Sequence, residues 1–262
     1  MTNIPRLSQN TLHAISPGIA VPAYDRAAVA PGIVHFGPGA FQRAHLASYV
    51  ETLLPRDPRW GMVGLSLRSG ALAGGLAAQD YLYTLTELDA PLRYRVLGAV
   101  KDYVAAPAQP ERAFAALTHP AAKLVTITVT EKGYCLDARG GLDVAHPDIA
   151  RDLSRPHAPA SLIGWLAEGL ARRRAAGLAP FIVMSCDNVA ANGPKLRRAV
   201  LDYARALGRA DLRTGSRTPC AFPPPWSTAS RRRPMTPSEA ASPPPSALPT
   251  PCRCSASVSR NG

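Results

Sequence analysis

The chain has 262 residues, of which 46% are apolar and 18% are charged, and its formal net charge is +12. This apolar content suffices for one large globular domain or two modest ones, which excludes a chain that is disordered throughout. No run approaches the roughly 18 consecutive apolar residues of a membrane span, and the N-terminus lacks a basic-then-apolar signal peptide. We therefore expect a soluble, cytoplasmic protein.

The positive charge is unevenly distributed along the chain. Residues 1–212 hold 23 basic and 17 acidic side chains, whereas residues 213–262 hold 7 and 1, so the last segment carries half of the net charge. The same segment holds 11 of the 27 prolines and 14 Ser or Thr residues. The composition predicts a folded domain over 1–212 and a disordered Pro/Ser/Arg-rich tail over 213–262.

The folded part begins with a predicted strand, turn and helix. Gly32–Phe36 is a short apolar run that ends at a Gly-Pro-Gly turn, and Phe41–Leu54 follows with a helical pattern. Every fourth residue of that helix is apolar or aromatic, which predicts a buried face containing a packed, hydrogen-bonded histidine. This face consists of Phe41, His45, Tyr49 and Leu53.

A second strand and a hairpin are predicted next. Trp60–Leu67 has the pattern of a strand, and Ala71–Ala78 that of a short Ala/Gly-rich helix. Tyr81–Leu88 and Tyr94–Val100 alternate apolar and polar residues, which is typical of half-exposed antiparallel strands. They predict a hairpin inserted into the domain.

The remaining pattern indicates a parallel sheet. Lys123–Thr130 and Pro180–Ser185 predict central parallel strands, separated by a helix over Ala160–Ala176. A last helix is predicted over Asn192–Leu207, with Asn192 as its N-cap. The alternation favours an α/β fold with a doubly wound, Rossmann-type, mostly parallel sheet, in which ligands bind at the carboxyl ends of the strands.

The first turn is the predicted nucleotide site. Gly37 permits a sharp turn after the strand, Gly39 lets the backbone approach a pyrophosphate, and the amides of Ala40 and Phe41 would face the anion. The third glycine of the usual dinucleotide fingerprint is replaced by Gln42. The alternative is an ordinary Gly-Pro-Gly turn in an unrelated α/β protein.

Three segments carry a family resemblance: Phe36–His45, Val129–Cys135 and Ser185–Asn188 with the nearby Asn192-Gly193. Together, and in this order, they resemble the polyol-specific long-chain dehydrogenases, the family of mannitol 2-dehydrogenase and fructuronate (mannonate) reductase. The resemblance covers roughly residues 8–212. It implies an N-terminal Rossmann-type domain that binds NAD(H), followed by a largely helical catalytic domain. The implied reaction is hydride transfer between NAD(P)(H) and a polyol or keto-sugar acid.

Asn188 is the candidate catalytic residue. It follows an apolar strand, where its carboxamide N–H can donate to a substrate oxygen as negative charge develops. The resemblance implies an oxyanion site at this position. The alternative is that Asp187 and Asn188 end the strand and cap the next helix.

Thr130, Glu131 and Arg43 are further candidates. Thr130 and Glu131 end another predicted strand, and the resemblance supports a place in the nicotinamide pocket; the alternative is a solvated ion pair between Glu131 and Lys132. Arg43 lies one turn into the first helix, where it either approaches the pyrophosphate or is a surface arginine.

The end of the second predicted strand bears on the cofactor. An acidic residue there binds the ribose 2′-hydroxyl of NAD, whereas an arginine without a neighbouring acid accommodates the 2′-phosphate of NADP. The segment reads Leu-Arg-Ser-Gly-Ala from Leu67 to Ala71 and has no acid. NAD(H) is the expectation from the resemblance, and NADP(H) bound through Arg68 is the alternative.

No metal site is predicted. The six histidines lack the spacing of metal ligands. Cys135 and Cys186 both follow apolar strands and are expected to be buried, reduced thiols.

The resemblance also implies a catalytic lysine in a Lys-x4-Asn-x2-His element, which this sequence lacks. The residues five positions after its four lysines are Ala106, Thr128, Asp137 and Val200. The general acid/base of the family is therefore not expected in this chain.

The tail is consistent with a shifted reading frame. Back-translated with suitable codons and read two bases later, Arg213–Cys220 can give Asp-Trp-Ile-Glu-Asp-Pro-Val, and Phe222–Ser230 can end in Thr-Met-Val-Asp-Arg-Ile. Cys254–Gly262 can give Leu-Arg-Glu-Arg-Phe-Pro-Gln-Trp. These three peptides resemble, in order, stretches located after the Rossmann domain in the family. We expect an out-of-frame tail that replaces the catalytic domain and leaves the chain inactive alone.

The alternative is a non-enzymatic basic protein whose natural tail binds nucleic acid or acidic partners. Aromatic residues interleaved with basic ones would favour it, but Phe222 and Trp226 lie apart from Arg231–Arg233. Nucleic acid is therefore not the expected partner. The oligomeric state and the particular sugar do not follow from the sequence.

Overall fold

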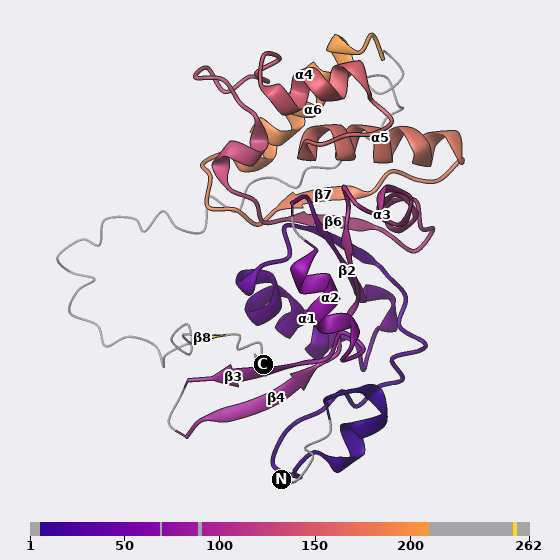
Figure 1. The fold of residues 1–262 in the computed structure, drawn as a ribbon, viewed down its shortest axis with the longest axis vertical. Helices are drawn as coiled ribbons and strands as arrows, with labels where there is room; N and C mark the ends of the chain where they lie inside the picture. Colours follow the sequence, from indigo (N-terminus) through magenta and orange to yellow (C-terminus); the bar gives the residue numbers. More distant parts are fainter. Residues whose placement is uncertain (1–5, 69, 89–90, 210–253, 256–262) are drawn as a thin grey trace, which may run out of the picture.

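The computed structural model describes residues 6–68, 70–88, 91–209 and 254–255 (Figure 1). Its centre is a five-stranded parallel sheet with the order β5-β2-β1-β6-β7. The doubly wound prediction is confirmed, although β7 lies at the edge of the described sheet and the prediction of a central strand there is wrong. The strands are β1 (Ile33–Phe36), β2 (Met62–Ser66), β5 (Val100–Ala105), β6 (Leu124–Ile127) and β7 (Ile182–Ser185).

The strand order creates a topological switch point between β1 and β6, because the chain leaves β1 toward β2 on one side and later returns to β6 on the other. Phe36 pairs with Leu65 and Ile127, and Ile127 pairs with Ser185. The carboxyl ends of these four strands are therefore aligned, and the residues that come next in each case lie along one edge of the sheet.

The two faces of the sheet bury separate cores. Val34 and Phe36 of β1 point into one core and Ile33 into the other, as the alternation of side chains along a strand requires. The first core packs α3 (Pro110–Leu117), α5 (Leu162–Ala175) and α6 (Asn192–Ala206); α4 (Pro147–Ser154) covers α5. The second packs α1 (Ala47–Leu53), α2 (Ala71–Ala77) and the hairpin. Neither α3 nor α4 nor β5 was predicted.

The inserted hairpin is confirmed. It consists of β3 (Tyr83–Glu87) and β4 (Arg93–Leu97), which pair antiparallel (Figure 1). The short β8 (Cys254–Ser255) pairs with β3. The rest of the predicted disordered tail, 213–262, lies outside the described residues. Short 3₁₀ helices occur at η1 (Gln9–Ala14), η3 (Pro58–Trp60) and η4 (Glu131–Tyr134). Among the described residues, none of the helices has the length and apolar character of a membrane span.

The predicted buried face of the first helix is wrong. The helix starts at Ala40 and passes through a π-helical turn, η2 (Gln42–Leu46), into α1. Its predicted face is in solvent: Tyr49 is 66% exposed, and His45 stacks on Phe41 and contacts Tyr49 edge-on instead of packing in the core. A different set of side chains is buried instead, and two of them are alanines, which allow close helix–sheet contact. The buried residues are Gln42, Ala44, Ala47, Val50 and Leu54.

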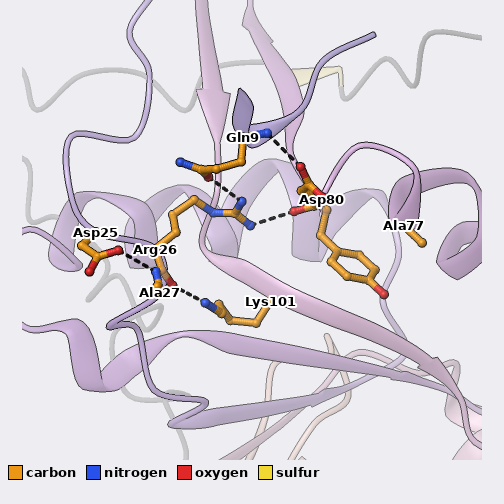
Figure 2. Close-up of a pocket in the computed structure, with 8 residues that line it drawn as sticks. Gln9, Asp25, Arg26, Ala27, Ala77, Asp80 and Lys101 are labelled. Atoms are coloured by element: carbon orange, nitrogen blue, oxygen red, sulfur yellow. Dashed lines mark hydrogen bonds between the residues drawn. The ribbon is translucent and has the colours of Figure 1, made fainter. Parts of the chain in front are cut away.

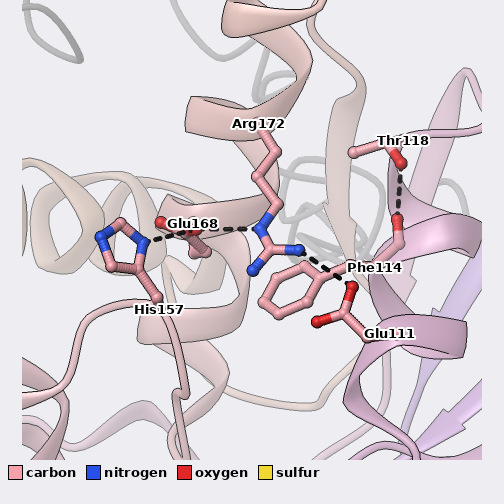
Figure 3. A network of polar contacts seen from close by, with 6 residues as sticks. All are labelled: Glu111, Phe114, Thr118, His157, Glu168 and Arg172. Carbon is pink, nitrogen blue, oxygen red and sulfur yellow. Dashed lines mark hydrogen bonds and ion pairs between the residues drawn. The ribbon is translucent and has the colours of Figure 1, made fainter.

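A polar network joins α3 to α5 (Figure 3). Glu168 is only 7% exposed and accepts hydrogen bonds from Arg172 Nε and His157 Nδ1, each at 2.9 Å. The Arg172 guanidinium lies 3.6 Å from the centre of the Phe114 ring and 3.5 Å from Glu111 Oε2. The buried carboxylate of Glu168 is thus paired with the Arg172 cation and accepts a second hydrogen bond from His157.

Candidate nucleotide-binding site

The turn after β1 requires glycine at its first position. Gly37 has a φ of +81°, and a Cβ atom there would lie 2.0 Å from the main-chain oxygen of Thr128. The Gly37 N–H donates to the Leu65 oxygen at 3.1 Å, and the Thr128 hydroxyl donates to the Gly37 oxygen at 2.9 Å. The turn is therefore anchored to both strands that flank β1.

Gly39 is different, because the fold itself does not require a glycine there. A Cβ atom at Gly39 would meet only the Gly37 oxygen, at an ordinary contact distance of 3.7 Å. The space beside it is open, next to exposed Ala40 and Phe41 at the start of the helix. The first N–H groups of a helix have no acceptor within it and favour an anion.

Gln42 stands at the position of the third glycine of the fingerprint, and its side chain makes a buried polar contact. Its side chain is fully buried, its Oε1 accepts from the Tyr103 hydroxyl at 3.0 Å, and its Nε2 lies 3.7 Å from Met62 Sδ. Gly64 makes room, since a Cβ atom there would lie 2.3 Å from the Tyr103 ring. This contact joins the π-helical turn at the start of the helix to β5.

Two arginines flank the turn. Arg43 is half-buried, and its Nε has no hydrogen-bond partner among the residues that the structure describes. Arg68 is exposed just after β2, and its backbone N–H donates to Ser66 Oγ. Ser69 lies outside the described residues. Arg43 thus lies in the helix that follows β1, and Arg68 lies just after the carboxyl end of β2.

The second and third sequence motifs meet beside β6 and β7. The hydroxyl of the fully buried Tyr134 lies 2.6 Å from both Asp187 Oδ2 and Ser185 Oγ. Burial raises the pKa of Asp187, and the hydrogen bond from Tyr134 opposes that rise. Tyr134 stood in the second motif, but no role was predicted for it.

The capping interpretation does not hold. The Asp187 carboxylate contacts Tyr134, and the N-cap of α6 is Ala191, with a φ of +53°. Asn192 is the first residue of α6, so the prediction that it is the N-cap is also wrong. Its Nδ2 donates to the Asp187 oxygen at 2.8 Å and its Oδ1 accepts from the Gly193 N–H at 2.7 Å, which ties the helix start to the strand end.

Asn188, Thr130 and Glu131 are all exposed. Asn188 follows Asp187 after β7, and Thr130 is the N-cap of η4, which Glu131 begins. No ion pair joins Glu131 to Lys132 in the described ranges. All three side chains follow strands whose carboxyl ends align with that of β1.

The two cysteines of the domain are free thiols. Cys135 is buried and Cys186 half-buried, so the prediction of burial is confirmed for Cys135 and only partly for Cys186. Burial raises the pKa of Cys135 to about 11 and also raises that of Cys186. Both thiols are therefore protonated near neutral pH.

A cavity of about 390 Å³ lies elsewhere, at the amino end of β5 (Figure 2). Arg26 dominates it and donates to Gln9 Oε1 and to the main-chain oxygens of Asp80, Gly98 and Val100. Lys101 donates to the Arg26 oxygen. The Arg26 and Lys101 side chains thus donate to oxygen atoms of the protein itself. The cavity contains none of the site residues predicted from the sequence.

Sequence reasoning missed a polar chain beneath the turn. His35 in β1 is fully buried; its Nδ1 lies 2.8 Å from Thr126 Oγ1 and its Nε2 lies 2.8 Å from Thr128 Oγ1. Burial lowers the pKa of His35 to about 4. A histidine inside an otherwise apolar strand, next to the glycine turn, was the available signal.

Comparison with known proteins shows the family to which this domain belongs. Residues 31–215 match the model of the mannitol dehydrogenase Rossmann domain. The chain is 42% identical over 207 residues to the polyol:NADP oxidoreductase of Gluconobacter oxydans, covering 76% of this chain and 43% of that protein. It is also 42% identical over 207 residues to a mannitol 2-dehydrogenase of Cereibacter sphaeroides, covering 77% and 43%.

A solved structure agrees. Pseudomonas fluorescens mannitol 2-dehydrogenase, in a ternary complex with NAD and D-mannitol, is similar with a TM-score of 0.74 and 37% identity, covering 79% of this chain and 43% of that one. The chain thus spans about 43% of the length of these relatives.

Proposed function

Because the chain belongs to the mannitol dehydrogenase family, whose Rossmann domain it contains, we propose that residues 1–212 bind NAD(H), with NADP(H) as the alternative. In the whole enzyme this domain would serve hydride transfer between the nicotinamide and a polyol or keto-sugar acid. The observation that carries the proposal is the glycine turn at the switch point of the sheet, anchored on β2 and β6.

The residues at this turn fit a dinucleotide. Open space at Gly39 admits a pyrophosphate close to the backbone, and the N–H groups of Ala40 and Phe41 supply donors at a helix start. The buried Nε of Arg43 lacks a partner in the described part of the chain, as a group reserved for an anion would. Gly37 holds the turn in shape.

Asn188, Thr130 and Glu131 would face the nicotinamide and the substrate. The bound cofactor supplies or accepts the hydride. The exposed carboxamide of Asn188 would donate to the substrate oxygen on which negative charge develops, while Thr130 and Glu131 would line the pocket. These roles are proposals that rest on the alignment of the strand ends and on family membership.

Residues 213–262 are proposed to be out-of-frame polypeptide in place of the helical catalytic domain. The family match ends at residue 215, close to the change of composition after residue 212. Sequencing of the gene and its transcript tests this directly. A single intact frame through Gly262 in both would overturn it.

Fluorescence titration of the 262-residue chain with NADH and NADPH tests the nucleotide site. We expect saturable binding of at least one of them, with negligible oxidation of mannitol or mannonate by this chain alone. Absence of binding to either dinucleotide would overturn the nucleotide proposal. Measurable turnover would instead overturn the proposal that the catalytic domain is missing.

A further inference from the structure

Only one assignment of donors and acceptors fits the hydrogen bonds that connect Thr126, His35, Thr128 and Gly37 beneath the glycine turn. The Gly37 oxygen can only accept, so the single proton of the Thr128 hydroxyl is donated to it at 2.9 Å. Thr128 Oγ1 must therefore accept from His35, at 2.8 Å, and the ring carries its proton on Nε2. Nδ1 is then an acceptor, and the Thr126 hydroxyl donates to it at 2.8 Å.

The ring is suited to hold this arrangement. His35 and Thr126 are both fully buried between β1 and its neighbours, so solvent does not compete for the hydrogen bond between them. Burial keeps the pKa of His35 near 4, and the imidazole is neutral at pH 7. A neutral ring with its proton on Nε2 links β6 to β1 at the switch point.

The last bond of this polar chain bears on the nucleotide turn. Pro38 has no backbone N–H, so the peptide after Gly37 is held through the Gly37 oxygen rather than through the next amide. We propose that His35 is a positioning residue for nucleotide binding: through Thr128 it fixes the Gly37 carbonyl, and with it the path of the backbone to Gly39 and Ala40. The inference rests on the nucleotide-binding function proposed above.

Isosteric variants of the full chain test the proposal. Thr128→Val removes the donor to Gly37, and Thr118→Val is the matched control, since Thr118 Oγ1 also donates to a backbone oxygen, that of Phe114 at 2.8 Å, but at the end of α3. We expect Thr128→Val to raise the Kd of the dinucleotide that binds by about tenfold, as for loss of one hydrogen bond, and Thr118→Val to leave it unchanged.

Variants of His35 distinguish a role in positioning the turn from a role in packing. His35→Leu should raise the Kd as Thr128→Val does, while His35→Gln, which keeps an N–H donor, should remain within about threefold of the wild-type value. The two effects of His35→Leu and Thr128→Val should not add, because both break one chain of hydrogen bonds. Melting temperatures are measured alongside, to show that each variant is folded.

Amide hydrogen exchange at Gly37 provides a readout without nucleotide. Its N–H is bonded to Leu65, and we expect at least tenfold faster exchange in Thr128→Val but not in Thr118→Val. Wild-type Kd and exchange in a folded Thr128→Val, or equal changes in Thr118→Val, would overturn the inference. If the wild-type chain binds no dinucleotide, the proposed function fails, and the exchange rates still show whether the hydrogen bonds position the turn.

Discussion

The hydroxyl of Tyr134 lies 2.6 Å from Oδ2 of Asp187 and thereby joins the segment after β6 to the segment after β7. Tyr134 is buried and Asp187 is half-buried, and burial raises the pKa of each. A hydrogen bond to a charged group in such surroundings contributes more than a bond between neutral groups. The contact therefore holds the two strand ends beside which Thr130 and Asn188 lie.

Tyr134→Phe should lower the free energy of unfolding by about 1.5–3 kcal/mol, because it leaves the Asp187 carboxylate without its buried donor. Tyr203→Phe is the matched control: Tyr203 is also buried, and its hydroxyl has no partner among the described residues. That change should be neutral or stabilising. Urea unfolding measures both, and an equal loss in the two variants would contradict the importance of the contact.

The sheet was predictable because its strands are short apolar runs bounded by glycine and proline, and the hairpin because its strands alternate. β5 was missed since Val100–Ala105 includes Lys101 and Asp102 and lies at an edge, where polar residues are tolerated. The face of the first helix was misassigned because aromatic spacing was taken for burial. Contact with the sheet selects small residues such as Ala44 and Ala47.

The local structure of the candidate site was predictable where backbone conformation demands a residue type and not where tertiary contacts decide. The need for glycine at position 37 follows from a turn, and the structure gives it a positive φ. Gln42, by contrast, departs from the fingerprint, and only the contact with Tyr103 explains it. The bond between Tyr134 and Asp187 joins residues 53 positions apart, which no local pattern reveals.

Glycine substitutions should separate folding from binding at the turn. Gly37→Ala combines a positive φ with a Cβ 2.0 Å from the Thr128 oxygen, so it should cost more than about 2 kcal/mol of stability. Gly177→Ala isolates the φ contribution, about 1–2 kcal/mol, because nothing lies within 4 Å of its Cβ. Gly39→Ala should leave stability within about 0.5 kcal/mol.

Gly39→Ala should nevertheless raise the Kd of the bound dinucleotide by about tenfold or more, because the methyl group occupies the space proposed for the pyrophosphate. Fluorescence titration and thermal unfolding of the same samples measure the two effects. Unchanged affinity in a folded Gly39→Ala variant would exclude close backbone approach of the ligand at this residue.

Arg68→Ala should change cofactor preference. If the exposed guanidinium after β2 binds a 2′-phosphate, its removal should weaken NADPH binding by about 1.5–3 kcal/mol and leave NADH binding unaffected. Arg139→Ala, which removes another exposed arginine, controls for net charge. A tenfold preference of the wild-type chain for NADH, or equal effects on both dinucleotides, would contradict the role of Arg68.

His35 should make stability depend on pH. Its folded-state pKa is about 4, below the ordinary 6.5, so the unfolded chain binds the proton more readily. Stability is therefore lost as pH falls from about 6.5 toward 4, by about 3 kcal/mol between pH 7 and pH 4. Urea unfolding of wild type and His35→Gln across this range isolates the contribution as a difference; parallel curves would contradict it.

Removal of the Arg172 side chain from the network around Glu168 should lower the free energy of unfolding. Arg172→Leu removes a guanidinium that stacks on Phe114 and leaves a carboxylate that is 7% exposed with only His157, whose side chain is 75% exposed (Figure 3). We expect a loss of about 3 kcal/mol. Arg198→Leu breaks an exposed pair with Asp202 and should cost less than about 1 kcal/mol.

The double variant Glu168→Gln with Arg172→Leu shows whether the cost comes from the stranded charge. Removing both charges leaves a neutral amide beside His157, so part of the stability lost in Arg172→Leu should return. Urea unfolding of the single and double variants at pH 7 completes the cycle. If the losses of the two single variants simply add, the stabilisation lies in the packing of Arg172 on Phe114 and not in the neutralisation of Glu168.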